Sequence, residues 1–342
     1  MKKKKFITVL ILFSVIFLLI YNYSLVYYGL IQARGQLKIV FNTVPVKEIL
    51  GDASFPDSLK NKVRLIQEVR SYAIYNLGLK GEKNYTTYYD QQGKELMWVV
   101  TACEPYQLES YTWNFPILGS FTYKGFFIRE MAEKEAARLN SLGFDTSIRN
   151  AGGWSTLGIL KDPILSGMLD RSNGALVELI IHELTHGTIF IRNDVSFNEN
   201  LATFIGTEGT KIFLSDNYGE RSNVLGNYVR MVEDREKFSD YVLLGAELLD
   251  SLYLSFGPEW SVSQKEEEKS IWFQEFIENL DTLKFNNCRY YENYFTTSEI
   301  NNTFFMSYLR YRGGLGQFEK TFTEKFDHDL VSYIRFLKEE YK

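Results

Sequence analysis

The chain begins with a basic stretch and an apolar segment. Residues 6–28 contain no charged side chain and follow four consecutive lysines at residues 2–5. A helix of that length can cross about 30 Å of hydrocarbon, and the lysines predict that the amino terminus stays in the cytoplasm. No small-residue cleavage site follows the apolar segment, and no cysteine stands just after it, since the first cysteine is Cys103. We therefore expect residues 1–28 to form an uncleaved signal anchor rather than a removed signal peptide.

The middle of the chain mixes helical and strand patterns. Apolar residues at helical spacing predict a helix over residues 58–78 and another over 126–142, and residues 29–50 look like a continuation of the first helix. Residues 84–104 are rich in β-formers around a turn, which predicts a hairpin. Residues 144–156 predict a further strand.

From residue 173 onward the pattern is helical. Its predicted breaks lie at glycine or proline positions, near Gly209, Gly219, Gly257-Pro258 and Gly313-Gly314. The sum is an α+β fold with a small antiparallel sheet. We expect one domain over residues 29–342, with a β-containing part at about 50–170 and a largely helical part at about 171–342.

The amino-acid composition excludes several classes of protein function. Hydrophobic residues make up 45% of the 342 residues, which suits a globular protein with a sizeable core. The formal net charge of −5 argues against nucleic acid as a partner, because phosphate contacts need a basic surface. Two cysteines, Cys103 and Cys288, exclude a disulfide scaffold and a cysteine-based zinc site. Both are expected outside the cytoplasm, and whether they pair stays open.

Two of the three histidines stand in one short motif. Residues 182–186 read His-Glu-Leu-Thr-His, which is H-E-x-x-H, within an apolar helical segment. Imidazoles four residues apart share one helical face and can reach a single ion. Glu183 projects beside that face, where it can take a proton from a metal-bound water. The motif predicts a metallohydrolase site with one Zn²⁺.

A zinc site of this kind needs a third protein ligand and an open position. Glu199 is the preferred candidate, because a helix that begins near Ser196 or Asn198 can fold back against the motif helix. Glu208 is an alternative ligand or a supporting group, and Asp194 could orient a ligand histidine. His328 is less suitable, since it lies between two aspartates in a polar stretch.

These residues carry a resemblance. His182-Glu183-x-x-His186 with Asn198-Glu199-x-x-Ala202 resembles the gluzincins, the zinc peptidases with a His-His-Glu site. More narrowly, the chain resembles the bacterial family called putative aminopeptidases. Further blocks of that resemblance are Tyr28-Gly29-x-x-Gln32-Ala33-Arg34-Gly35-Gln36, Tyr123-Lys124-Gly125-Phe126-Phe127 at the start of the mid-chain helix, Ser155-Thr156-Leu157-Gly158, Asp162-Pro163 and Asn301-Asn302.

The resemblance implies a zincin-like peptidase fold and a membrane-attached, periplasmic location. The chain departs from the family pattern near its start, because many relatives look like lipoproteins with a cysteine there. Residues 21–24 read Tyr-Asn-Tyr-Ser instead, so the helix itself would attach the protein to the bacterial inner membrane, with the catalytic domain in the periplasm or outside.

The reaction expected from such a site is hydrolysis of a peptide bond. Glu183 acts as general base, and a tyrosine, with Tyr308 as candidate, helps to stabilise the oxyanion. We expect an edge strand with Ser155, Thr156 and Gly158 to bind the backbone of the peptide substrate as an additional strand. An aminopeptidase also needs an acid for the substrate amine. Glu178, Glu208 and Asp194 are near the site in sequence, and nothing singles one out.

Three functions stay open at this point. The first is a membrane-anchored zinc aminopeptidase, the second an envelope endopeptidase with the same machinery, and the third a non-catalytic zinc-binding envelope protein. The presence of Glu183 speaks against the third, because a structural zinc site needs no base.

Overall fold

A computed structural model describes residues 13, 21–115, 119–150, 161–291, 294–295 and 300–341. Contacts divide the chain into two units, Met1–Thr43 and Val44–Lys342. Helix α2 (Tyr23–Phe41) is the helix of the first unit that the structure describes. The predicted anchor lies mostly outside the described residues. Within them, no helix is both long and apolar enough to cross a membrane.

The prediction of one continuous helix over residues 29–50 is wrong. Helix α2 ends at Phe41, and Val44–Pro45 forms a short strand, β1, before helix α3 (Val46–Gly51) begins. Pro45 explains the break, because proline has no N–H to donate to a preceding helical turn. Helix α4 (Asp57–Tyr75) then follows Pro56, so it begins one residue before the predicted start and ends three residues before the predicted end.

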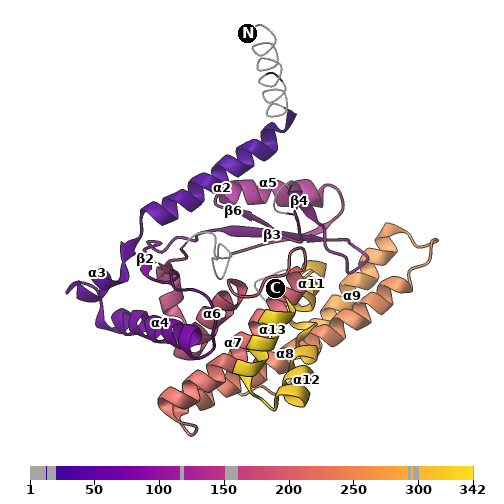
Figure 1. Cartoon of the computed structure of the whole chain (residues 1–342). Helices are drawn as coiled ribbons and strands as arrows, with labels where there is room; N and C mark the ends of the chain where they lie inside the picture. The colour runs from indigo at the N-terminus through magenta and orange to yellow at the C-terminus, as the bar shows by residue number, and fades with distance from the viewer. Residues whose placement is uncertain are drawn as a thin grey trace. The chain divides into compact units, whose positions relative to one another are not determined.

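The predicted hairpin over residues 84–104 is also wrong, because its two strands belong to different sheets (Figure 1). Strand β2 (Thr87–Tyr89) pairs with β1 and, in parallel, with β8 (Ile164–Leu165). Strand β3 (Trp98–Cys103) lies between β6 (Lys124–Phe126) and β7 (Asp145–Asn150), antiparallel to both. Residues 99–103 are buried, and a strand buried in this way is stabilised by a neighbour on each edge.

The region around β3 contains strands that the sequence pattern did not reveal. Strands β4 (Trp113–Phe115) and β5 (Gly119–Phe121) pair with each other. Strand β6 lies where a helix start was expected, and helix α5 (Arg129–Asn140) begins only after it. Figure 1 shows α5 on one side of the β6-β3-β7 sheet and the helices of the second half on the other.

The second half is helical, as predicted. After the 3₁₀ turn η1 (Ser166–Asp170), the helices are α6 (Asn173–His186), α7 (Val195–Tyr218), α8 (Asn223–Leu254), α9 (Val262–Leu280), α10 (Cys288–Tyr291), α11 (Asn302–Arg312), α12 (Leu315–Phe326) and α13 (Leu330–Glu340). The breaks near Gly219, Gly257 and Gly313 are confirmed. The break near Gly209 is wrong, because α7 runs through it. The described chain is thus α+β and mostly helical, with small sheets.

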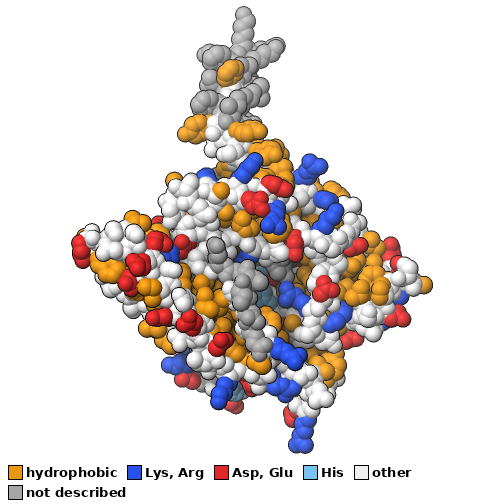
Figure 2. Space-filling model, turned by 180° about the vertical axis from the view of Figure 1, so that it is seen from behind, with side chains coloured by type: hydrophobic (Ala, Val, Ile, Leu, Met, Phe, Trp, Pro, Cys, Tyr) orange, Lys and Arg blue, Asp and Glu red, His pale blue; other side chains and the backbone are white. Residues whose placement is uncertain are grey.

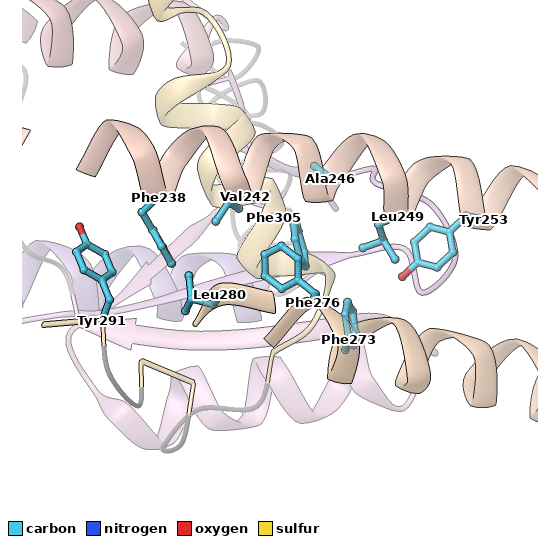
Figure 3. Packing of buried hydrophobic residues seen from close by; sticks show 10 residues of the cluster. All are labelled: Phe238, Val242, Ala246, Leu249, Tyr253, Phe273, Phe276, Leu280, Tyr291 and Phe305. Atoms are coloured by element: carbon cyan, nitrogen blue, oxygen red, sulfur yellow. The ribbon is translucent and has the colours of Figure 1, made fainter. Parts of the chain in front are cut away.

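Aromatic side chains fill the interface of α8, α9 and α11. Figure 3 shows this packing for ten buried residues: Phe238, Val242, Ala246, Leu249, Tyr253, Phe273, Phe276, Leu280, Tyr291 and Phe305. Gly245 lets Phe276 approach α8, since a Cβ there would lie 2.4 Å from the ring atom Cε2. The aromatic content of 16% therefore contributes to the core of the helical half.

The two cysteines are free in the structure. Cys103 is buried in β3, whereas Cys288 is exposed at the start of α10. Burial raises the pKa of the Cys103 thiol to about 12.

Candidate metal centre

Helix α6 carries the H-E-x-x-H motif through the protein interior. Ser172 caps its start by accepting a hydrogen bond from the backbone N–H of Ala175. Its apolar face is fully buried, with Leu176, Val177, Ile180, Ile181 and Leu184 all at 0% exposure. This packing fixes the helix, so that His182 and His186 occupy one line on its remaining face.

Side-chain hydrogen bonds hold the loop between α6 and α7. Asn198 is 3% exposed, and its side chain binds both backbone groups of Ile191, at 2.8 Å to the N–H and 2.7 Å to the C=O. Asp194 caps α7 by accepting from the N–H of Phe197 at 2.9 Å. The cap is therefore Asp194 rather than Ser196 or Asn198, and Glu199 lies near the start of α7.

Helix α7 crosses α6 at very short range. A Cβ on Gly206 would lie 3.3 Å from both the carbonyl oxygen of Glu178 and the Cβ of His182. One turn later, a Cβ on Gly209 would lie 3.2 Å from side-chain methyl groups of Ile181 and Leu77. Gly209 is thus a close-packing residue inside a helix, which explains why it does not end α7.

These three elements bring His182, His186 and Glu199 together, as predicted; we call them the ligand cluster. The Nε2 atoms of the two histidines are 3.1 Å apart, and each lies 3.5 Å from Oε2 of Glu199. Their side chains are 18%, 8% and 14% exposed, respectively. Within the described residues, His182, His186 and Glu199 form a group of side chains that could together hold a metal ion.

The spacing suits a tetrahedral cation of zinc size. Ligand atoms at about 2.0–2.1 Å from a tetrahedral zinc lie about 3.3 Å from one another. The observed distances of 3.1 and 3.5 Å bracket that value. The donor set of two imidazoles and one carboxylate leaves a fourth position for water or substrate.

Electrostatics in the cluster favour an ionised carboxylate. Burial alone would raise the pKa of Glu199, but hydrogen bonds from His182 and His186 lower it to about 2. Burial alone would lower the pKa of His186, and Glu199 more than offsets this, so that the pKa lies above its usual 6.5. The cluster thus holds one fixed negative charge that can be shared with a proton or with a cation.

The other predicted acids have different contacts. Glu178 pairs with Arg235 at 2.7 Å and accepts from the hydroxyl of Tyr228 at 2.9 Å. Glu208 pairs with Lys211 at 2.7 Å. In the described chain the Nδ1 atom of His186 is buried without a hydrogen-bond partner, and the carboxylate of Asp194 serves as the α7 cap instead.

The remaining predicted residues do not join the ligand cluster in the described structure. Tyr308 packs in the aromatic core against Phe238 and Phe304, and its pKa is raised by burial and by Tyr294. His328 packs against Phe322, between α12 and α13. Ser155, Thr156 and Gly158 lie outside the described residues.

Sequence reasoning missed two tyrosines near the cluster, Tyr123 and Tyr311. Burial raises the pKa of both hydroxyls, and the nearby negative charges of Glu199 and Glu183 raise it further. Both hydroxyls therefore keep their protons at neutral pH. Tyr123 opened one of the family-like sequence blocks, and Tyr311 lies one helical turn beyond the predicted Tyr308.

A hydrogen-bond network attaches the end of α11 to the start of α7. The backbone carbonyl of Arg310 accepts from Asn200 Nδ2 at 2.6 Å and from Ser196 Oγ at 3.3 Å. Asn200 also accepts from the backbone N–H of Gly314 at 3.0 Å. Because Asn200 follows Glu199 directly, this network sets the position of Tyr311 relative to the ligand cluster.

Figure 2 shows one face of the molecule, on which histidine surface lies at the bottom of a hollow with basic side chains beside it. The ligand cluster, the adjacent Glu183 and two tyrosine donors together have the chemistry of a hydrolytic site.

The comparisons with known proteins agree with this class. Residues 27–340 match the family described as putative aminopeptidase, and the chain belongs to that family. Comparison with curated proteins and with solved structures gave no match.

Proposed function

We propose that the protein is a zinc-dependent peptidase that acts as an aminopeptidase. The observation that carries the proposal is the ligand cluster, whose donor atoms lie 3.1–3.5 Å apart beside Glu183 of the same helix. Family membership supports peptidase chemistry. A zinc ion bound by His182, His186 and Glu199 would act as a Lewis acid for water and for the peptide carbonyl.

The chain's own residues supply the proton transfers. Glu183 is half-buried, and it is next to the ligand His182 in sequence. It takes a proton from the attacking water and gives it to the leaving amine. Tyr123 and Tyr311 replace Tyr308 as the candidates that donate a hydrogen bond to the developing oxyanion.

The location of the site remains a prediction from the amino-terminal pattern. We propose that the apolar segment anchors the chain and that the lysines hold its start in the cytoplasm, which puts the peptidase part on the outer side. Protease added to intact spheroplasts should then digest residues 44–342, and protection of that part would reverse the orientation.

The test of function uses the full chain, purified with detergent and compared with its Glu183→Gln variant. Zinc content is measured first, and hydrolysis of aminoacyl-nitroanilides is compared with cleavage of an unfolded protein. We expect one zinc per chain in both proteins, and a loss of several orders of magnitude in turnover for the variant. Cleavage of the unfolded protein alone would indicate an endopeptidase, and bound zinc without any hydrolysis a binding role.

The two tyrosine candidates are tested against Tyr308. Removal of one oxyanion donor costs about 10²–10³ in kcat, so Tyr123→Phe or Tyr311→Phe should show this loss. Tyr308→Phe is the control and should leave kcat within about threefold of the wild-type value. Unchanged kcat in the Tyr123→Phe/Tyr311→Phe double variant would exclude both residues from that role.

A further inference from the structure

Two arginine side chains stack on the tyrosines near the ligand cluster. The guanidinium carbon of Arg149, on β7, lies 5.8 Å from the ring centre of Tyr311. The guanidinium carbon of Arg310, in the last turn of α11, lies 5.9 Å from the ring centre of Tyr123. Cation–π contacts of this kind hold a guanidinium group in place while leaving its N–H groups available for an anion.

Neither arginine forms an ion pair within the part of the chain that the structure describes. Arg310 is only 6% exposed, and its buried Nη1 has no hydrogen-bond partner there. Its Nη2 reaches the carbonyl of Thr122 at 3.5 Å. A buried arginine without a carboxylate is costly for stability, which indicates a purpose other than folding. Burial lowers the pKa of Arg310, although the neighbouring Tyr311 and Glu199 oppose this effect. The two arginines are linked through α11, since Arg149 contacts Tyr311 and Arg310 precedes Tyr311 in the chain.

The charge balance of the site therefore favours an anion. The charge of a bound divalent cation would be balanced by Glu183 and Glu199, and the two guanidinium groups would remain uncompensated. Two of the three acids considered for a substrate amine already have basic partners, since Glu178 pairs with Arg235 and Glu208 pairs with Lys211.

We infer that Arg149, supported by the charge of Arg310, forms a subsite for the free α-carboxylate of a peptide substrate. The inference rests on the proposed peptidase function and adds a substrate class to it. Substrates of this site are short peptides whose C-terminal carboxylate lies one or two residues beyond the bond that is cut. The exposed guanidinium of Arg149 can bind a carboxylate through two parallel N–H donors, which an amide cannot match.

The first experiment compares free acids with C-terminal amides. The kcat/KM of the zinc-loaded full chain is measured for one dipeptide and one tripeptide in both forms. We expect the acids to be preferred by about 10- to 100-fold, the range that a charged hydrogen-bonded pair provides. In Arg149→Gln the preference should fall to about one, and Arg149→Lys should retain part of it. Equal rates for acid and amide in the wild type, or an unchanged preference in Arg149→Gln, would overturn the subsite.

Control variants separate charge at the subsite from general effects. Arg129 is also exposed, but it pairs with Glu133 at 2.8 Å on α5. Arg129→Gln should keep the full preference for acids. Arg310→Lys keeps the positive charge but not the planar fork, so it should keep more of the preference than Arg310→Gln, provided that circular dichroism shows both to be folded. If they are unfolded, the Arg149 variants decide the question alone.

A second measurement does not depend on catalysis. Calorimetry measures binding of the same acids and amides to zinc-loaded Glu183→Gln, which should favour the acids by the same 10- to 100-fold. Hydrolysis without an acid preference would refute the subsite and leave the proposed function intact. If the wild type hydrolyses no peptide, the proposed function is refuted. The subsite would still stand if Glu183→Gln binds acids selectively and the Glu183→Gln/Arg149→Gln double variant does not.

Discussion

The packing of α7 on α6 leads to the sharpest prediction, which compares two glycines of one helix. Gly206→Ala would place a Cβ 3.3 Å from the Glu178 carbonyl oxygen and from the Cβ of His182, which are parts of α6 that cannot rotate away. Gly209→Ala would meet methyl groups of Ile181 and Leu77 at 3.2 Å, and such side-chain ends can turn. Both variants replace glycine by alanine within α7, so each serves as a control for the other.

Two opposing contributions determine how each substitution changes the free energy of unfolding. Alanine gains about 1 kcal/mol over glycine in a helix interior, whereas overpacking against rigid neighbours costs about 1–3 kcal/mol. We therefore expect Gly206→Ala to destabilise the zinc-free protein by up to about 2 kcal/mol. Gly209→Ala should be neutral or stabilising by up to about 1 kcal/mol, because its neighbours can adjust.

Metal affinity is the more specific consequence. To relieve the contact at Gly206, α7 must move away from α6 by a few tenths of an ångström, and Glu199 moves with it. Metal sites tolerate changes in ligand distance of about 0.2 Å, so we expect zinc affinity to fall at least about tenfold in Gly206→Ala. Gly209→Ala should retain it.

Competition with a chromogenic chelator measures the affinity, and urea denaturation of the zinc-free proteins measures the stability. The reasoning would be refuted by a Gly206→Ala protein that binds zinc as tightly as the wild type. Equal losses of affinity in both variants would also refute it, because the distinction between rigid and adjustable neighbours would then have no effect.

Three further predictions concern single residues. The pKa of His186 is raised above 6.5 and that of Glu199 is lowered from 4.5 to about 2, so their pairing stabilises the zinc-free protein fully between about pH 4.5 and 6.5. This stabilisation weakens above the window as His186 loses its proton, and below it as Glu199 gains one. The Glu199→Gln variant should therefore have a lower unfolding free energy than the wild type at pH 6, and a much smaller difference at pH 9. Equal losses at the two pH values would contradict the pairing. Asn198→Ala removes two buried hydrogen bonds to Ile191 and should cost about 2–3 kcal/mol in urea denaturation, whereas a cost below 0.5 kcal/mol would show that the loop holds without this clamp. In the native protein a thiol reagent should label the exposed Cys288 quickly and the buried Cys103 only on unfolding, and fewer than two reactive thiols in the unfolded, unreduced protein would reveal a disulfide.

The clustering of His182, His186 and Glu199 was predictable because its geometry is local. Two histidines four residues apart share a helical face whatever the rest of the chain does, and Glu199 follows them after one loop and one cap. The loop chemistry was less predictable, since the cap proved to be Asp194 and Asn198 proved to clamp Ile191. Polar residues near a helix start compete for the same role, and sequence alone does not rank them.

The parts of the site that come from distant segments were not predictable. Tyr308 and Tyr311 differ by one helical turn, and the hydrogen bond from Asn200 to the Arg310 carbonyl, across 110 residues, decides which end of α11 meets α7. The strand partners of β3 are equally non-local, and for this reason β-formers on either side of a turn predict a hairpin that the structure does not contain. Gly209 predicts a helix break only when the close approach of α6 is unknown, and the α7 sequence does not reveal that approach.

The separation of these contacts along the chain has a consequence for how the protein matures. His182, His186 and Glu199 lie within one helix–loop–helix segment, and contacts between near neighbours form early because their loop-closure entropy is small. The network between Asn200 and α11 closes only after α11 and Gly314 have been made, more than 100 residues later. If the ligand cluster holds zinc as we propose, a nascent chain would acquire the metal well before its tyrosines and arginines are in place. An incompletely folded molecule would then carry zinc before it could hydrolyse a peptide.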